Sequence, residues 1–239
     1  MGEIQVLPTS YNGIEFRSRL EARWAVFFDA CGVKWEYEPE GFKMKDGTMY
    51  LPDFKLHNVV IETSDNNDRF DFEKRRWEYH IDVCDLWVEV KGKMSDTDAN
   101  KIRKFAGSFK EHGNDGKNAF QCYNVTRLRE RPIAVVGNIP KGDNWWEMMC
   151  DYNNNVNLYK FGLLTTVTEW EIQKVFCIDS DGKLRLTHGG ALMEDGVNEE
   201  QTLLAYRLAY NAKFDHGRTP RSIDVADTMK KAELKEWLE

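Results

Sequence analysis

Two carboxylates and a lysine stand out because they lie on segments rich in β-branched and aromatic residues. Asp53 follows Pro52 in the first segment, and Glu89 and Lys91 alternate with apolar residues in the second, Leu86 to Lys91. Successive side chains of a strand point to opposite faces. Leu86, Val88 and Val90 therefore lie on one face, and Glu89 and Lys91 lie together on the other. If the two strands pair, Asp53 and Glu89 meet beside Lys91. Two carboxylates and an ammonium are what a hard divalent cation and an activated water need.

The segment Thr48 to Leu56 is expected to be one strand with Asp53 on its polar face. In that register the core-facing residues are Tyr50, Pro52, Phe54 and Leu56. Each fragment alone also has an ordinary explanation. A Glu-x-Lys on a strand is usually an exposed ion pair, and Pro-Asp is usually a turn.

In this order the motifs resemble the PD-(D/E)xK nuclease superfamily. The resemblance rests on YNGIEFRSRLEARWAVFFDACGVKWEYEPEGF (Tyr11 to Phe42), YLPDF (Tyr50 to Phe54) and WVEVKG (Trp87 to Gly92). Together these stretches are similar to phage and bacterial proteins with this nuclease core, over residues 11 to 140. The resemblance implies an α/β fold, with a restriction-endonuclease-like mixed β-sheet flanked by helices.

The resemblance also implies roles for individual residues. Asp53 and Glu89 would bind Mg²⁺ or Mn²⁺, with the carbonyl of Val90 as a third protein ligand. Lys91 would orient or help to deprotonate the attacking water and offset charge in the transition state. The implied reaction is hydrolysis of DNA phosphodiester bonds without a covalent enzyme intermediate, by an endonuclease rather than an exonuclease.

The expected first helix carries Glu21, which matches a glutamate that many superfamily members place near the metal. Its alternative is a solvated helix residue paired with Arg17, four positions earlier. A basic rim around the metal site would bind the nucleic acid; its members are Arg17, Arg19, Lys93, Lys101 and Lys104. Basic residues on helices are, however, most often merely solvated.

Two other functions stay open from the sequence. The fold could serve as a catalytically silent nucleic-acid-binding or interaction module, although an intact Asp, Glu and Lys set argues against that. RNA could replace DNA as the substrate. A homodimer is left open, because nucleases of this superfamily that cut both strands often act as dimers.

The connection between the two site strands departs from the superfamily pattern. A long insertion, Asn58 to Asp85, replaces the expected short connection. Glu62 within it is a weaker candidate than Glu89 for the second carboxylate, because no lysine follows two residues later. The insertion carries a cation–aromatic cluster at Lys74 to Trp77 that could grip a nucleic acid, but its many acidic residues favour a solvated surface extension.

Hydrophobic periodicity predicts the order of elements. The first 140 residues, assigned to a nuclease core, are expected to hold helices over 16–30 and 96–110 and strands over 33–37, 48–56, 86–91 and 133–136. Residues 141–239 are expected to form a C-terminal extension packed on or appended to the core. It would contain strands over 163–167 and 174–178, a hairpin turn at Gly182, and helices over 199–214 and 226–238.

Composition limits the classes of protein. The 239 residues are 41% hydrophobic and carry a formal net charge of −7, but the segment from Lys101 to Arg131 has eight cationic against three acidic residues. The longest apolar run, Trp24 to Phe28, is far too short to span a membrane. The five cysteines include no CxxC pair, and no export signal precedes them. A cytoplasmic protein is expected, in the host cytoplasm if it is viral. Among the histidines only His57 lies near Asp53.

Overall fold

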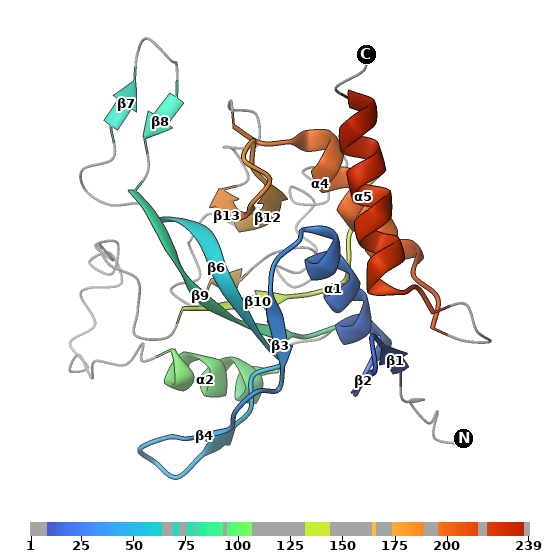
Figure 1. Cartoon of the computed structure of the whole chain (residues 1–239). Coiled ribbons are helices and arrows are strands. Elements are labelled where there is room, and N and C mark those ends of the chain that lie inside the picture. The colour runs from blue at the N-terminus through green and yellow to red at the C-terminus, as the bar shows by residue number, and fades with distance from the viewer. Residues whose placement is uncertain are drawn as a thin grey trace.

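A computed structural model describes residues 9–63, 69–71, 76–78, 80–92, 95–106, 132–143, 164–165, 174–188, 196–214 and 219–236. The fold is α/β, with a curled mixed sheet flanked by helices (Figure 1). No helix in these ranges is long and apolar enough to cross a membrane. Lys93 and most of the basic segment 101–131 lie outside the described residues.

The elements follow the chain in two groups. The first contains β1 (Thr9–Tyr11), β2 (Ile14–Phe16), α1 (Arg19–Ala30), β3 (Trp35–Tyr37), β4 (Phe42–Lys43), β5 (Met49–Tyr50), β6 (Phe54–Thr63), β7 (Arg69–Asp71), β8 (Arg76–Glu78), β9 (His80–Val90), α2 (Asp96–Phe105) and β10 (Ile133–Val136). The second contains β11 (Leu164–Thr165), β12 (Lys174–Ile178), β13 (Leu184–His188), α4 (Glu199–Asn211) and α5 (Ser222–Glu236).

The main sheet has seven strands in the order β11-β10-β9-β6-β13-β12, with β3 also paired to β6. The pairs β9–β10 and β6–β13 are parallel, and the other pairs are antiparallel. β3 pairs with the first residues of β6, whereas β13 pairs with Val60 and Ile61 further along it. β6 therefore connects the N-terminal strands to the C-terminal hairpin β12–β13.

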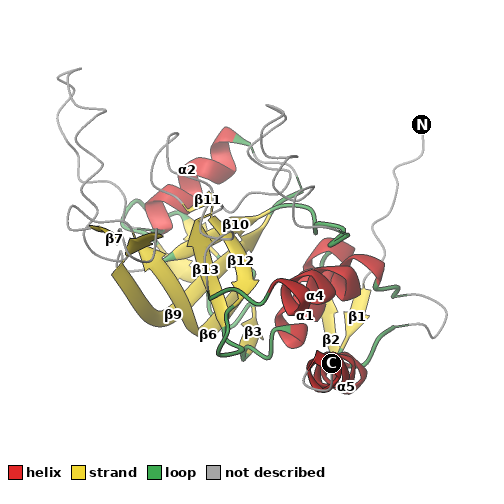
Figure 2. Cartoon of the chain, turned by 90° about the horizontal axis from the view of Figure 1, so that it is seen from above, coloured by secondary structure: helices red, strands yellow, loops and turns green. Residues whose placement is uncertain are grey.

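Helices cover both faces of this sheet (Figure 2). On β9, Val88 packs into the larger core with α1 and α4, whereas its neighbour Trp87 packs into a smaller core with Ile102 and Phe105 of α2. β10 alternates between the two cores in the same way, so all four of its residues are buried. Burial on both faces explains why the IAVV run lacks the usual polar alternation.

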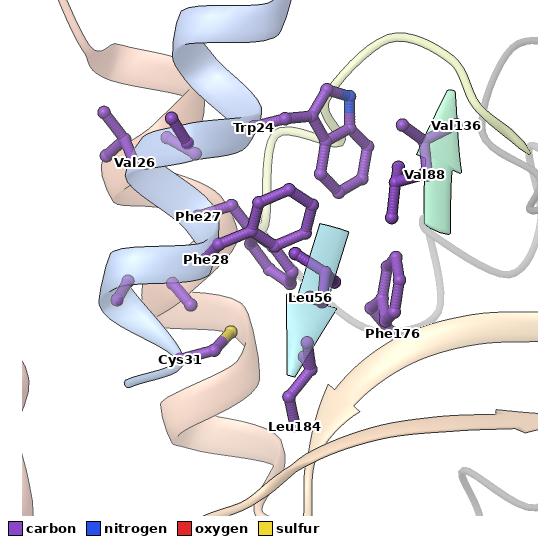
Figure 3. Close-up of a cluster of buried hydrophobic side chains, with 14 of the residues drawn as sticks. Trp24, Val26, Phe27, Phe28, Cys31, Leu56, Val88, Val136, Phe176 and Leu184 are labelled. Carbon is purple, nitrogen blue, oxygen red and sulfur yellow. The ribbon is translucent and has the colours of Figure 1, made fainter. Parts of the chain in front are cut away.

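Helix α1 provides the largest aromatic part of the core. Ser18 caps its N-terminus by accepting a hydrogen bond from the backbone N–H of Glu21. Its side chains Trp24, Phe27 and Phe28 point towards strand residues of the sheet (Figure 3). The Trp24 indole also donates a 2.8 Å hydrogen bond to the carbonyl of Gly137, just after β10. This hydrogen bond joins the middle of α1 to the end of β10.

The structure corrects two boundaries expected near the site. The segment 48–56 is divided into β5 and β6, because Pro52 cannot continue a ladder as a hydrogen-bond donor. The segment 58–85 is not one surface excursion: residues 59–63 of β6 pair with residues 80–84 of β9 in a long hairpin. The small hairpin β7–β8 lies beyond its end (Figure 1).

The described C-terminal elements share the sheet and the core with the N-terminal ones. The hairpin β12–β13 turns at Gly182, as expected, and Phe176 of β12 packs against Trp24 and Phe28. α4 and α5 both pack against α1. α4 ends three residues earlier than expected, at Asn211, and α5 begins four residues earlier, at Ser222.

Candidate active site

The pairing of β6 with β9 brings Asp53 and Glu89 together. Phe54 is the register partner of Val88, and extending that antiparallel register by one residue places Asp53 opposite Glu89. Both carboxylates lie on the face that carries Trp87 and are almost fully buried, with 1% and 4% of their surface exposed. The convergence expected from strand alternation is confirmed for this pair.

Backbone geometry fixes Asp53. Its Oδ2 accepts a 2.6 Å hydrogen bond from the backbone N–H of Val90, which joins the start of β6 to the end of β9. Its Oδ1 accepts a hydrogen bond from the guanidinium of Arg17. Burial and the nearby charge of Glu89 raise the pKa of Asp53 to about 7, against the opposing effect of the Val90 hydrogen bond. Burying two negative charges side by side is costly without a cation between them.

Glu89 is held by two donors. The Tyr50 hydroxyl donates to Oε2 at 2.8 Å, and the Lys91 ammonium pairs with Oε1 at 2.7 Å. Burial lowers the pKa of Lys91, but the hydrogen bond and charge of Glu89 outweigh it and raise the pKa above its usual value. Lys91 is therefore a cation at neutral pH in this arrangement. Burial and the charge of Glu89 likewise raise the pKa of Tyr50.

Glu21 is buried at the N-terminus of α1 rather than solvated. Its carboxylate accepts hydrogen bonds from the Ser18 hydroxyl at 2.9 Å and from the Tyr37 hydroxyl at 2.6 Å. Its charge also contributes to the raised pKa of Asp53, so the two carboxylates are electrostatic neighbours. The ion pair with Arg17 that is the alternative for Glu21 is present at 4.0 Å, but it does not leave Glu21 in solvent.

Arg17 lies among the acidic groups of the site. Its guanidinium pairs with Asp53, and its Nε lies 2.8 Å from Glu38 Oε1 in an ion pair without hydrogen-bond alignment. More than half of the Arg17 side chain, 57%, is nevertheless exposed. This is the one expected nucleic-acid-binding residue that the described structure places in contact with an expected metal ligand.

The other residues of the expected basic rim stand in different positions. Arg19 and Lys101 are exposed, on α1 and α2 respectively. Lys104 forms a 2.5 Å ion pair with Asp46 in the β4–β5 turn. That pair compensates the charge of Lys104 and connects the turn to α2.

Two residues near the expected centre have other contacts. His57 lies between Glu36, at 2.6 Å, and Asp85, at 3.2 Å. Glu62, the weaker candidate for the second carboxylate, is buried and pairs with Arg185 of β13. Neither arrangement includes Asp53 or Glu89.

The donor set suits a hard cation that keeps part of its water. Within the described ranges, no group of three or more His, Cys, Asp and Glu side chains is arranged to hold a metal ion. Mg²⁺ is commonly bound by one or two carboxylates, with water and substrate phosphate completing its shell. Asp53 and Glu89, with the Val90 carbonyl, fit that pattern. Burial and the charge of Glu89 both raise the pKa of Asp53, so a bound cation would offset the cost of keeping the two carboxylates charged.

Sequence reasoning misses Tyr50 and Tyr37, and it places Tyr50 on the wrong face. Alternation predicts Tyr50 on the core side with Phe54, but it packs against Phe105 of α2 and contacts Glu89. The chain bends at Asp53, between β5 and β6, so alternation cannot be carried from one strand to the other. Pro52 itself is the signal that the strand ends there.

Comparisons with known proteins add nothing to this geometry: no protein-family model, no curated protein and no solved structure matches the chain.

Proposed function

We propose that the chain is a metal-dependent nuclease that hydrolyses phosphodiester bonds in DNA, with Asp53, Glu89 and Lys91 at its centre. One observation carries the proposal: the β6–β9 register sets Asp53 opposite Glu89, and Lys91 is paired to Glu89. Buried groups whose pKa values are shifted by a specific charged neighbour cluster at functional sites, and Asp53 is such a group.

The order of elements supports a restriction-endonuclease-like core. β3, β6 and β9 form consecutive antiparallel pairs after α1, and β10 follows α2 to pair parallel with β9. The PD-(D/E)xK superfamily that the motifs resemble has a mixed sheet of this kind. Asp53 immediately precedes β6 and Glu89 lies near the end of β9, which is the order of the two carboxylates in the motif.

Each residue has a role in the proposed reaction. Asp53, Glu89 and the Val90 carbonyl would hold Mg²⁺ or Mn²⁺. The bound cation would polarise the phosphodiester and favour attack by water. Lys91 offsets phosphate charge and orients the water, and Glu21, an electrostatic neighbour of Asp53, adds a third carboxylate. A bond forms from the water oxygen to phosphorus, the ester P–O bond breaks, and a proton ends on the released hydroxyl.

A cleavage assay tests the proposal. Purified protein is incubated with Mg²⁺ or Mn²⁺ and with labelled linear, circular, single-stranded or four-way DNA, or with RNA. We expect cleavage of at least one DNA form, and nicked circles would identify an endonuclease. Asp53→Asn and Lys91→Met should each lower the rate by about 10²-fold or more. Asp85→Asn, on the same strand as Glu89 but paired with Lys55 and His57, is the matched control and should cleave normally.

Full activity in Asp53→Asn or Lys91→Met would contradict the assignment of the centre. No cleavage, together with no calorimetric signal for Mn²⁺ binding, would instead favour a silent binding module. Cleavage of RNA alone would keep the site and change the substrate. Urea unfolding of each variant confirms that lost activity is not lost folding.

A further inference from the structure

Arg17 holds the one oxygen of Asp53 that the backbone leaves available. Oδ2 of Asp53 accepts the hydrogen bond from the Val90 N–H, and Oδ1 accepts the one from Arg17. Asp53 can reach a divalent cation most directly through Oδ1. A guanidinium and a divalent cation on the same carboxylate oxygen repel each other at such short range. The observed contact of Arg17 therefore competes with the metal site assigned above.

The position of Arg17 in the chain allows its side chain to move while its backbone stays in place. Residue 17 lies between β2 and α1, and its backbone N–H donates to Glu21 Oε2 and to the Tyr37 hydroxyl, each at 3.2 Å. The side chain is 57% exposed, so solvent surrounds much of the path of its guanidinium. Tyr37 and Glu21 are anchored to each other at 2.6 Å.

If the Arg17 guanidinium leaves Asp53, a phosphodiester of the substrate is the partner that it would bind instead. Arg matches phosphate oxygens through two parallel hydrogen bonds, and its contacts with phosphate are stronger than neutral ones. Arg17 stands beside both Asp53 and Glu21, so any phosphate brought to Asp53 and Glu89 comes within reach of the same side chain.

We propose that Arg17 is a substrate-binding latch: without metal it pairs with Asp53, and when a divalent cation and DNA bind it leaves Asp53 and pairs with the substrate phosphate. This inference rests on the proposed nuclease function. It assigns Arg17 two opposite effects. The residue weakens binding of the metal alone and strengthens binding of the nucleic acid.

Two binding measurements on the whole chain separate these effects, and neither uses turnover. Calorimetric titration of Mn²⁺ without DNA should show about tenfold tighter binding to Arg17→Gln than to the wild type. Fluorescence anisotropy with a labelled oligonucleotide, single-stranded and duplex, in Ca²⁺ should show about tenfold weaker binding. Arg221→Gln is the matched control, because its exposed guanidinium pairs with Asp224 at the start of α5, and it should leave Mn²⁺ affinity within about twofold.

A conservative variant separates the effect of the positive charge at position 17 from the effect of the guanidinium shape. Arg17→Lys keeps the charge but loses the planar fork, so Mn²⁺ affinity should stay close to that of the wild type while oligonucleotide affinity falls. Urea unfolding of each variant shows that it is folded.

The outcomes are distinct. If Arg17→Gln binds Mn²⁺ no tighter than a metal-binding wild type, the latch is wrong and the proposed metal site stands. If the variant loses Mn²⁺ and oligonucleotide affinity together, Arg17 is a structural residue and the latch is also wrong. If neither protein binds Mn²⁺, the proposed function fails and the latch fails with it.

Discussion

The Tyr50 hydroxyl donates a 2.8 Å hydrogen bond to Glu89. Tyr50 is the last residue of β5, which ends two residues before Pro52. Tyr50 and Glu89 are both buried, and Lys91 holds the other carboxylate oxygen of Glu89. The carboxylate is therefore oriented from two sides. Tyr50 itself is fixed by the ring of Phe105 on α2, at a centroid distance of 4.9 Å. Helix α2 thus supports the orientation of Glu89 through one side chain.

Tyr50→Phe should impair the site without removing any expected metal ligand. The change deletes one hydrogen bond to a buried carboxylate, which is expected to lower the free energy of unfolding by about 1–3 kcal/mol. Loss of a group that orients a ligand typically costs about 10- to 100-fold in metal affinity or activity. Calorimetric titration of Mn²⁺ and DNA cleavage rates measure the second effect, and urea unfolding measures the first.

Tyr11→Phe is the matched control for that variant. The Tyr11 hydroxyl donates at 2.6 Å to Asp29, near the opposite end of α1 from Glu21, and Tyr11 is also buried. It should lose stability while keeping DNA cleavage and Mn²⁺ affinity. If both variants lose activity in proportion to stability, Tyr50 has no specific role in orienting Glu89.

The raised pKa of Asp53 predicts how stability changes with pH in metal-free protein. Burial and the charge of Glu89 raise this pKa to about 7 in the folded state, whereas an unfolded aspartate titrates near its usual value of about 3.9. Between these values the folded state binds more protons than the unfolded state. Stability therefore falls as pH rises, by up to about 1.4 kcal/mol per pH unit from this group.

Asp53→Asn should remove that slope. In EDTA, the variant is expected to be more stable than the wild type at pH 8 by an amount on the order of a few kcal/mol, with the difference vanishing near pH 4. Urea unfolding at several pH values provides the measurement. A variant equally destabilised at every pH would show that Asp53 is not a desolvated charge in the folded protein.

Asp85→Asn is the control for this experiment, because the pKa of Asp85 is lowered rather than raised and the pH dependence of stability should have the opposite sign. Burial acts to raise the pKa of Asp85, but its hydrogen bonds and charge interactions with Lys55 and His57 lower it overall. A depressed folded-state pKa stabilises the protein above the unfolded value, and this stabilisation is lost as pH falls. This variant should therefore be less stable than the wild type at pH 7, with a difference that shrinks in acid.

Strand alternation predicts the faces of β9 near the site because residues 86–90 lie beyond the one register shift in its pairing with β6, and residues 87–90 pair evenly with β10. Val88 lies in the large core, and Trp87 and Glu89 lie on the opposite face, as expected. Alternation cannot place Tyr50, because a proline and a change of direction separate it from β6. Nor can it pair Arg17 with Asp53, 36 residues away, because that contact depends on the packing of α1 against the sheet.

The C-terminal hairpin shows a second limit. Local pattern and the turn at Gly182 predict its strands, and β12 agrees residue for residue. Local pattern cannot predict where the hairpin lies in the sheet. Its strand β13 pairs in parallel with Val60 and Ile61 of β6, which lie more than a hundred residues earlier in the chain. The sequence offers Glu62 as a weak site candidate, whereas its buried contacts with Arg185 and Thr187 belong to this junction.

Arg185→Met should destabilise the protein because it removes the guanidinium that pairs with the buried Glu62 carboxylate. Only 2% of the Glu62 side chain and 19% of the Arg185 side chain are exposed. Breaking a buried pair from one side typically costs about 3–5 kcal/mol. Urea unfolding measures the loss, and DNA cleavage at low temperature should be little changed because Asp53 and Glu89 are untouched.

The double variant Glu62→Met with Arg185→Met tests the physical cause. Replacing both charges by apolar groups of similar size is often neutral or stabilising, so most of the lost stability should return. If the double variant is as unstable as Arg185→Met, the loss comes from packing around Arg185 rather than from an uncompensated carboxylate.

Gly142 connects the segment after β10 to helix α4 by a close backbone approach. Its φ is +70°, and a Cβ at this position would lie 2.5 Å from the carbonyl oxygen of Leu203 and 2.9 Å from the backbone nitrogen of Arg207. Backbone atoms of a helix cannot move aside as a flexible side chain can. Gly142→Ala should therefore lower the free energy of unfolding by about 3 kcal/mol or more, combining overpacking with left-handed strain.

Gly182→Ala separates the two contributions to that loss. Gly182 has nearly the same φ, +75°, but nothing lies within 4 Å of the position that an alanine methyl would occupy, so only the conformational strain of about 1–2 kcal/mol remains. Urea unfolding of both variants should show the larger loss at Gly142. Equal losses would mean that α4 shifts readily away from the 132–143 segment, and that its packing there contributes little to holding α1 and the carboxylates of the site in place.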